Sequence, residues 1–448
     1  MFRNRYFWLL ISLFFVLKTE AKVTLTSIWG DNMVLQQQAE VTFRGKATPG
    51  KRVYASASWN HRKIYADCDR NGQWTLALPT PEAGGPYTIT FSDGEELTLK
   101  NILIGEVWFC SGQSNMEMPV KGFRGQPVYG SQPYIVSANP KRPLRLYTVK
   151  NNWSTTPKEE GIDGQWSEAS SEEVADFSAT AYFFGNLLQQ SLDVPVGLIH
   201  CSWSMSKIEA WMDKETLSHF SEVTLPDTNQ DKFEWAAGTP TLLWNAMVNP
   251  WKGFPVKGVI WYQGEANNER AADYGPLFDG MIRGWRNEFH RFLPFYFVQI
   301  APWNGYADRN AAYLREQQAD VAATLHNTGM VVVSDLVNDI SDIHPSLKKQ
   351  VGVRLANMAL KKTYHREEVE PYSPMLKSIR IEGRKVMVAT TAIKLTCNDK
   401  TIQNFEIVDQ AGNVYPADAK LMKNGEISVS SSKVKTPVAV RYCFTNDA

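Results

Sequence analysis

The sequence predicts an α/β protein in which a parallel-sheet domain is flanked by two β-sandwich-like segments. In residues 102–365, continuously apolar strands alternate with helical patterns, which favours a parallel sheet covered on both faces. Short strands separated by Gly and Pro turns fill residues 22–101, and a second β pattern fills residues 366–448. A chain of 448 residues has room for these three domains, since a typical domain has roughly 150 residues.

Residues 1–21 have the pattern of a secretory signal peptide. Arg3 and Arg5 precede a short apolar run, and the small residues Thr19 and Ala21 stand where signal peptidase requires them. The apolar run is shorter than the roughly 20 residues of a membrane-spanning helix. We therefore expect a secreted or periplasmic protein that has no membrane span after cleavage.

Composition limits the classes of partner and cofactor. The formal net charge is +0 and there is no basic block or acidic tail, so nucleic acid is not an expected partner. The 15 tryptophans suit carbohydrate contacts as well as a core. The 5 cysteines have no metal-ligand spacing, so they predict no metal site. Cys397 and Cys443 either form a disulfide or stay free.

The flanking segments are predicted from short β runs. The runs before the central domain are 23–29, 40–45, 51–59, 74–78 and 87–91. The runs after it are 377–381, 385–391, 405–408, 426–429 and 438–444. The first group contains no clustered acid–base set, so a packing or ligand-presenting role is expected for it.

The central domain is predicted from alternating strands and helices. The expected strands are 102–110, 194–200, 256–262, 294–300 and 330–335. The expected helices are 176–191, 240–248, 311–325 and 345–361, the second opened by Thr239 as N-cap and Pro240 at N1. Residues 119–170 have no clear periodicity and are expected to cross the surface.

Ser114 follows the strand around which the rest of this domain is organised. The apolar run 102–110 breaks abruptly into small polar residues in Gly105-Glu-Val-Trp-Phe-Cys-Ser-Gly-Gln-Ser-Asn-Met116. Open α/β sheets place their chemistry at the carboxyl ends of the strands. A serine at that edge is either a turn residue or a nucleophile, and the choice depends on whether another loop supplies a base.

His344 is the candidate base. It lies between a predicted strand and a predicted helix, in a loop at the same edge of the sheet. Asp342 stands two residues before it and could orient the imidazole or merely cap the helix that follows Pro345. Asp339 could compete with Asp342 for the orienting role.

The strand 256–262 ends in Gln263-Gly-Glu265, again at this edge. The Gln263 side-chain amide is a candidate hydrogen-bond donor to an oxyanion. Glu265 is either a second carboxylate of the site or a structural anchor, and the anchor is favoured.

Together these stretches resemble the sialate O-acetylesterase family, a branch of the SGNH hydrolases. The resemblance spans nearly the whole mature chain. The stretches that carry it include Asp31-Asn-Met-Val-Leu-Gln36, Gly84-Gly-Pro-Tyr-Thr-Ile89, the Ser114 segment, Gly197-Leu-Ile-His-Cys-Ser-Trp203, Ile208-Glu-Ala-Trp-Met212, Trp261-Tyr-Gln-Gly-Glu-Ala-Asn267, Leu314-Arg-Glu-Gln-Gln318 and Asp342-Ile-His-Pro345.

The resemblance implies an SGNH-type three-layer hydrolase domain over 102–365. It also implies Ser114 as nucleophile, His344 as base and Asp342 as its orienting acid. The Ser114 N–H, an N–H near Ser204 and the Gln263 amide are the expected oxyanion donors. The family usually has Gly-Gly where this sequence has Ser204 and Met205, which implies an altered oxyanion hole or a narrower acyl pocket.

The activity that the resemblance implies is hydrolysis of O-acetyl esters on carbohydrate hydroxyls, most of all those of sialic acids, through a serine acyl-enzyme and without a cofactor. Two alternatives stay open. The first is an acetylesterase of another polysaccharide such as xylan, and the second is a catalytically impaired glycan-binding relative. Sequence alone gives no oligomeric state.

Overall fold

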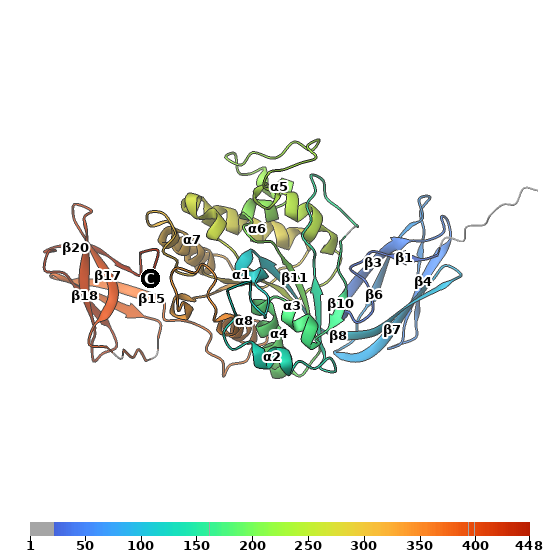
Figure 1. Cartoon of the computed structure of the whole chain (residues 1–448), viewed down its shortest axis with the longest axis horizontal. Helices are drawn as coiled ribbons and strands as arrows, with labels where there is room; N and C mark the ends of the chain where they lie inside the picture. The colour runs from blue at the N-terminus through green and yellow to red at the C-terminus, as the bar shows by residue number, and fades with distance from the viewer. Residues whose placement is uncertain (1–21, 161, 393, 398) are drawn as a thin grey trace, which may run out of the picture.

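The computed structural model describes residues 22–448 except 161, 393 and 398, so the predicted signal peptide lies outside the described residues. An α/β body lies between two β segments, the amino-terminal one in blue and the carboxyl-terminal one in orange (Figure 1). Within the described part of the chain, no helix combines the length and apolar character needed to cross a bilayer.

Two facing sheets form the amino-terminal segment. One contains β1 (Thr24–Leu25), β3 (Glu40–Lys46) and β6 (Gln73–Pro79). The other contains β2 (Val34–Gln36), β4 (Arg52–Ala57), β5 (Lys63–Asp67), β7 (Gly84–Ser92) and the first half of β8 (Glu96–Gly112). Phe43 of the first sheet packs on Phe91 of the second, with ring centroids 5.1 Å apart. This packing of two sheets is the sandwich that the sequence predicts.

Strand β8 joins this segment to the central sheet. Its first half pairs antiparallel with β7, and residues 106–112 pair in parallel with β11 (Val196–Ser202). The proposed domain boundary between residues 101 and 102 therefore falls inside one continuous strand. Because β8 is hydrogen-bonded to strands on both sides of that point, one sheet of the sandwich is continuous with the central sheet.

The central sheet has the order β10-β9-β11-β8-β12-β13-β14. Its parallel members are β9 (Leu144–Thr148), β11, β8, β12 (Gly258–Tyr262), β13 (Phe295–Val298) and β14 (Thr328–Val331). At one edge β10 (Trp166–Glu168) runs antiparallel to β9. The predicted parallel sheet is therefore present, and its carboxyl ends share one edge.

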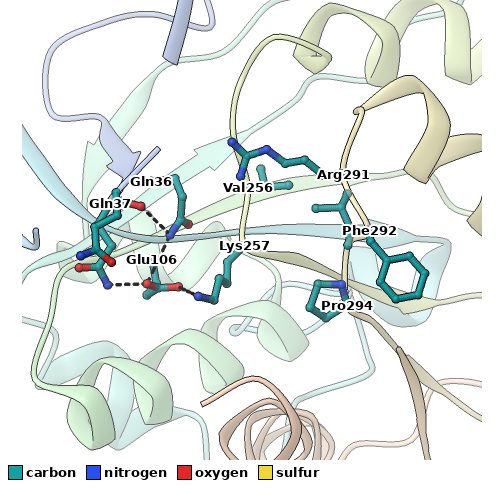
Figure 2. A pocket seen from close by; sticks show the side chains of 10 residues that line it. Gln36, Gln37, Glu106, Val256, Lys257, Arg291, Phe292 and Pro294 are labelled. Carbon is teal, nitrogen blue, oxygen red and sulfur yellow. Dashed lines mark hydrogen bonds and ion pairs between the residues drawn. The ribbon is translucent and has the colours of Figure 1, made fainter. Parts of the chain in front are cut away.

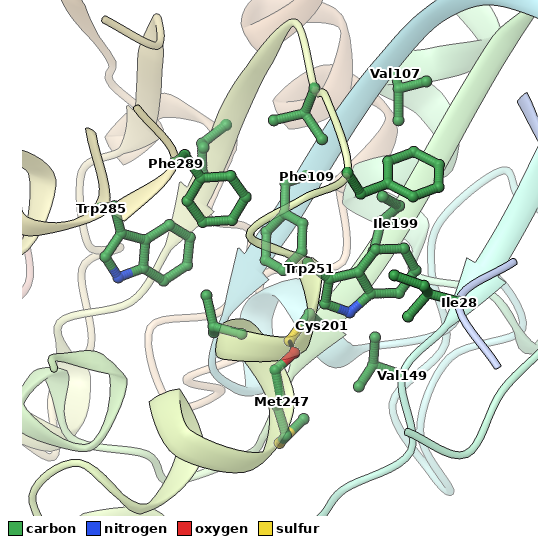
Figure 3. Packing of buried hydrophobic residues seen from close by; sticks show 14 of the residues in the cluster. Ile28, Val107, Phe109, Val149, Ile199, Cys201, Met247, Trp251, Trp285 and Phe289 are labelled. Atoms are coloured by element: carbon green, nitrogen blue, oxygen red, sulfur yellow. Dashed lines mark hydrogen bonds between the residues drawn. The ribbon is translucent and has the colours of Figure 1, made fainter. Parts of the chain in front are cut away.

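Helices cover both faces of this sheet, because alternate residues of each strand are apolar on both sides. Trp108 and Cys110 of β8 share a buried cluster with α4 (Ala179–Leu192) and α8 (Lys348–Lys362). On the other face Phe109 packs on Trp251 and on Trp285 of α6 (Tyr274–Glu288), as Figure 3 shows. Helix α7 (Asn310–Thr324) packs beside α6.

Three expectations for this region need correction. Residues 119–170 are not only a surface excursion, because they include α2 (Gln132–Val136) and the sheet strands β9 and β10. The helix expected from Thr239 begins at residue 242, since Thr241 has a left-handed backbone (φ 68°), and it winds as a π-helix over Trp244–Val248. The helix expected over 176–191 is present as α4 but begins only at Ala179, and a separate helix, α3 (Ser171–Asp176), precedes it.

The carboxyl-terminal segment is a single curled sheet of six strands, not two facing sheets. Its order is β15-β16-β19-β18-β17-β20, with bounds β15 (Leu376–Glu382), β16 (Lys385–Thr390), β17 (Ile402–Asp409), β18 (Val414–Leu421), β19 (Ile427–Ser430) and β20 (Pro437–Tyr442). Arg309 of the central domain binds the Glu406 carboxylate of β17 with both terminal nitrogens, at 2.7 and 2.9 Å. Cys397 and Cys443 both carry free thiols.

Candidate active site

Ser114 stands at the carboxyl end of the central strand. The strand ends at Gly112, which has a φ of 143°. A Cβ at this position would lie 2.1 Å from the Tyr262 carbonyl oxygen, so only glycine fits here. The chain then turns, the Gln113 N–H donates to the Tyr262 carbonyl at 2.9 Å, and Ser114 begins the helical turn α1 (Ser114–Glu117). Only 8% of Ser114 is exposed. The serine is thus held rigidly at the predicted sheet edge.

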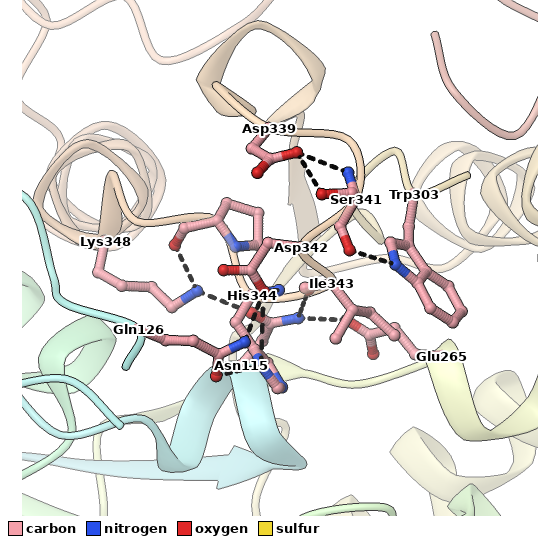
Figure 4. A network of polar contacts seen from close by, with 11 residues as sticks. Asn115, Gln126, Glu265, Trp303, Asp339, Ser341, Asp342, Ile343, His344 and Lys348 are labelled. Carbon is pink, nitrogen blue, oxygen red and sulfur yellow. Dashed lines mark hydrogen bonds and ion pairs between the residues drawn. The ribbon is translucent and has the colours of Figure 1, made fainter. Parts of the chain in front are cut away.

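His344 lies in the loop between β14 and α8, with its ring held by an amide rather than directly by a carboxylate (Figure 4). Nδ1 is 3.1 Å from Gln126 Oε1 but 3.8 Å from Asp342 Oδ1. Gln126 Nε2 donates to Asp342 Oδ1 at 2.8 Å, and the same oxygen accepts the His344 backbone N–H at 2.8 Å. Asp342 therefore orients the imidazole mainly through Gln126.

Gln126 was not found from the sequence. It lies in the irregular stretch after α1, where no periodicity or motif marks it. Asp339, the alternative acid, accepts hydrogen bonds from the Ser341 N–H and hydroxyl at 2.8 and 2.6 Å. Its carboxylate thereby caps its own turn.

The Ser114 and His344 segments meet through Asn115. Asn115 Nδ2 donates to the Ile343 carbonyl at 3.1 Å, which joins the residue after Ser114 to the residue before His344. Among the residues that the structure describes, no hydrogen bond joins the Ser114 hydroxyl to the His344 ring. Catalytic hydrogen bonds are often longer without substrate and shorten in the complex.

The environment of His344 favours the neutral imidazole. Burial lowers the pKa of His344 below its usual 6.5, and the positive charge of Lys348 lowers it further, while Asp342 opposes both. A neutral imidazole is the form that accepts a proton from a hydroxyl.

In the loop that contains Ser204 and Met205, the N–H expected to bind the oxyanion already has a partner. Both the N–H and the hydroxyl of Ser204 donate to one carboxylate oxygen of Glu117. The next residue, Met205, has a left-handed backbone (φ 60°) and a side chain that is 67% exposed. The backbone therefore adopts a conformation typical of glycine, while the Ser204 donor expected for the oxyanion is bound to Glu117.

The prediction that Gln263 is an oxyanion donor is at odds with the geometry. Its side chain is fully buried, and Nε2 donates to the Ser206 carbonyl at 3.0 Å and to Asn267 Oδ1 at 2.8 Å. Its Oε1 accepts from the Tyr274 hydroxyl at 2.9 Å. Because both amide hydrogens are used, Gln263 braces the loops around the site instead of facing it.

Glu265 has the contacts of an anchor. Its Oε1 accepts from Asn115 Nδ2 at 2.6 Å, and the whole side chain is buried. Burial raises the pKa of Glu265, against which the Asn115 hydrogen bond and the Lys348 charge act. This carboxyl supports the turn behind Ser114.

Nothing at this edge suggests a metal centre: over the described residues, no group of three or more His, Cys, Asp or Glu side chains could hold a metal ion.

One cavity of about 330 Å³ lies away from Ser114, beside Glu106 near the middle of β8 (Figure 2). Gln37 Nε2 and the Tyr364 hydroxyl donate to the two Glu106 oxygens at 2.5 and 2.9 Å. That buried carboxylate is bound within the protein and links β2, β8 and the region after α8.

Known proteins are similar to this chain over most of its length. A family model described as carbohydrate esterase, sialic acid-specific acetylesterase, matches residues 104–361. The sialate O-acetylesterases of Homo sapiens and Pongo abelii are each 28% identical over 458 residues, covering 93% of this chain and 86% of theirs. A solved carbohydrate acetylesterase from Xanthomonas citri has a TM-score of 0.86 and 33% identity, with 95% of each chain covered. The family resemblance predicted from the sequence is confirmed, and this chain is an enzyme of the carbohydrate esterase family of sialic acid-specific acetylesterases.

Proposed function

We propose that this protein is an exported serine esterase that removes O-acetyl groups from carbohydrate hydroxyls, with sialic acids as the first candidate substrates. The observation that carries the proposal is the meeting of the Ser114 turn and the His344 loop through Asn115 at one edge of a parallel sheet. The three-layer SGNH fold over residues 102–365 and export by residues 1–21 belong to this proposal. The sheet order β11-β8-β12-β13-β14 supports the fold assignment.

In the proposed mechanism, His344 Nε2 takes the proton of the Ser114 hydroxyl as Oγ attacks the acetyl carbonyl. The tetrahedral oxyanion accepts hydrogen bonds from the Ser114 N–H and from the Ser204 N–H, which must leave Glu117 to reach it. The intermediate then collapses, and His344 gives its proton to the sugar oxygen as the bond between that oxygen and the acetyl carbon breaks, which leaves the acetyl group on Ser114 Oγ. Water, deprotonated by the same imidazole, attacks the acetyl ester of Ser114, and acetate leaves as the serine regains its proton.

The substrate class can be tested by measuring acetate release from a 9-O-acetylated sialoglycan and from acetyl-xylan, with wild type and Ser114→Ala side by side. Faster release from the sialoglycan supports the proposal. Release from xylan alone would assign the enzyme to plant polysaccharide. A folded wild type that releases no acetate from either substrate would favour the alternative of an impaired glycan-binding relative. The observation behind this alternative is that the Ser204 N–H, an expected oxyanion donor, is bound to Glu117.

The activity is expected to persist into mildly acidic solution. Because burial and Lys348 hold the pKa of His344 below 6.5, the imidazole stays neutral at pH values where an exposed histidine is largely protonated. The acid limb of kcat/KM should therefore fall below pH 6.5, with full activity above it. A pH profile with p-nitrophenyl acetate measures this, and an acid limb above 6.5 would contradict it.

Gln263→Ala is expected to affect stability more than chemistry. Losing this amide removes the side-chain donor to the Ser206 carbonyl, which should cost about 1–3 kcal/mol of unfolding free energy. Asn267 Oδ1 still accepts from the Ile208 N–H, and the Tyr274 hydroxyl still donates to the Gln263 backbone carbonyl. The kcat of the folded variant should fall far less than the roughly 10²- to 10³-fold caused by removal of an oxyanion-hole donor. Thermal unfolding and steady-state kinetics separate the two effects. A loss of about 10²-fold at unchanged stability would restore Gln263 as a donor.

A further inference from the structure

A lysine is completely buried beside the candidate catalytic groups. Lys348, the first residue of α8, has 0% exposure. Its Nζ donates to Asn115 Oδ1 at 2.7 Å and to the Pro345 carbonyl at 2.8 Å, and it lies 5.7 Å from the centre of the Tyr262 ring. The proposed mechanism assigns this ammonium no step.

The Asn115 amide is held between two ionisable groups of opposite sign. Its Oδ1 faces the Lys348 ammonium, and its Nδ2 faces Glu265 Oε1 at 2.6 Å and the Ile343 carbonyl at 3.1 Å (Figure 4). A carboxylate only accepts and an ammonium only donates, so the amide can adopt one orientation. Both Asn115 hydrogens and its oxygen are thus fixed, and with them the contact between the two reacting segments.

Burying Lys348 and Glu265 around Asn115 costs folding free energy, so stability alone does not explain this network. Burying charged groups costs several kcal/mol per ion, and well-packed apolar residues of similar volume often replace them without loss. Retaining a buried lysine here is therefore better explained by what it orients. It sits between the turn that carries Ser114 and the loop that carries His344, and Figure 4 shows it directed toward both.

The titratable groups around Lys348 come from three elements. Glu265 faces it from the 3₁₀ segment Glu265–Asp273, Asp342 and His344 from the loop before α8, and Tyr262 from β12. Burial lowers the pKa of Lys348 to about 7, while Glu265 and Asp342 act to raise it. In acidic solution, where His344 titrates, Lys348 is protonated and opposes a second positive charge on the imidazole.

We propose that Lys348 is a positioning residue of this esterase. It holds the Ser114 turn against the His344 loop through Asn115, and its positive charge keeps the imidazole in the proton-accepting form. The proposal rests on the proposed function for its kinetic consequences. Its electrostatic consequence concerns His344 alone and can be measured without turnover.

The test compares Lys348→Met, Asn115→Ala and the control Lys349→Met, which removes the adjacent but exposed lysine. Lys348→Met should lower kcat for p-nitrophenyl acetate about 10²-fold, the order of loss expected from a small misplacement of reacting groups, with KM little changed. It should also move the acid limb of kcat/KM to higher pH. Asn115→Ala should lower kcat similarly but leave the acid limb in place. Lys349→Met should match the wild type.

A second readout separates this proposal from the proposed function. The His344 imidazole is titrated by NMR in an inactive Ser114→Ala background, with and without Lys348→Met, and its signal is assigned by its loss in His344→Gln. The His344 pKa should rise when Lys348 is removed. An unchanged His344 titration overturns the electrostatic role even if the enzyme is inactive. An unchanged kcat in folded Asn115→Ala overturns the positioning role, including when Lys348→Met does not fold. Wild type without esterase activity would instead refute the proposed function.

Discussion

Replacing Ser114 by alanine is expected to lower kcat for p-nitrophenyl acetate by about 10⁶-fold, the order of the loss found when the nucleophile of a serine hydrolase is removed. The reason is that the alanine side chain has no oxygen to attack the carbonyl, while the rest of the site stays intact. Ser114 Oγ makes no hydrogen bond within the described residues, so its loss should leave the unfolding free energy almost unchanged. Kinetics and thermal unfolding on the same sample test both parts.

Ser111 provides the matched control for this experiment. It lies three residues earlier on β8, and its buried hydroxyl has no hydrogen-bond partner among the residues that the structure describes. Ser111→Ala therefore removes a hydroxyl from the same strand end without touching the chemistry, and it should be neutral or slightly stabilising because an unpaired buried hydroxyl is costly. Near wild-type turnover by folded Ser114→Ala would end the proposed mechanism. An equal loss of turnover in Ser114→Ala and Ser111→Ala would show that the loss comes from disturbing the end of β8 and not from removing a nucleophile.

The sequence was informative where strong local patterns coincide with the sheet. Apolar strands that break into small polar residues predicted the edge at which Ser114 and His344 lie, since parallel strands align their carboxyl ends. The same reasoning could not find β9, because Arg145 interrupts its apolar pattern. The Arg145 guanidinium is buried and donates to the Arg142 and Leu144 carbonyls at 3.0 and 3.2 Å, a contact that depends on the folded backbone.

The sequence also could not predict which partners the side-chain amides and backbone N–H groups of the site bind. Position 263 is at the predicted edge, yet its amide points into the protein, toward Ser206 and Asn267. The Ser204 N–H faces Glu117, which is distant in sequence and in a different motif. Motif spacing places a residue near a site, but the partners of its hydrogens are decided by loops from several elements.

The Gln126 amide transmits the effect of the Asp342 carboxylate to the His344 ring. Asp342 can only accept, so Gln126 must present Nε2 to it and Oε1 to His344 Nδ1. The Nδ1 atom then carries the hydrogen, and Nε2 keeps the lone pair that a general base needs. The sequence offered Asp342 as a candidate orienting acid, while Gln126, which bridges Asp342 and His344, lies in a stretch without any recognisable pattern.

His344→Ala is expected to cost about 10⁴- to 10⁶-fold in kcat, comparable to the loss of the nucleophile, because base and nucleophile act as one unit. The double variant with Ser114→Ala should be no slower than either single variant. Asp342→Asn and Gln126→Ala should each cost less, since either change leaves the imidazole in place and disturbs only its tautomer. The exposed His326 supplies the control, as His326→Ala should retain wild-type kinetics. Independent, multiplying losses at 114 and 344 would show that the two residues do not share a step, and the base would then have to be sought elsewhere on the same sheet edge.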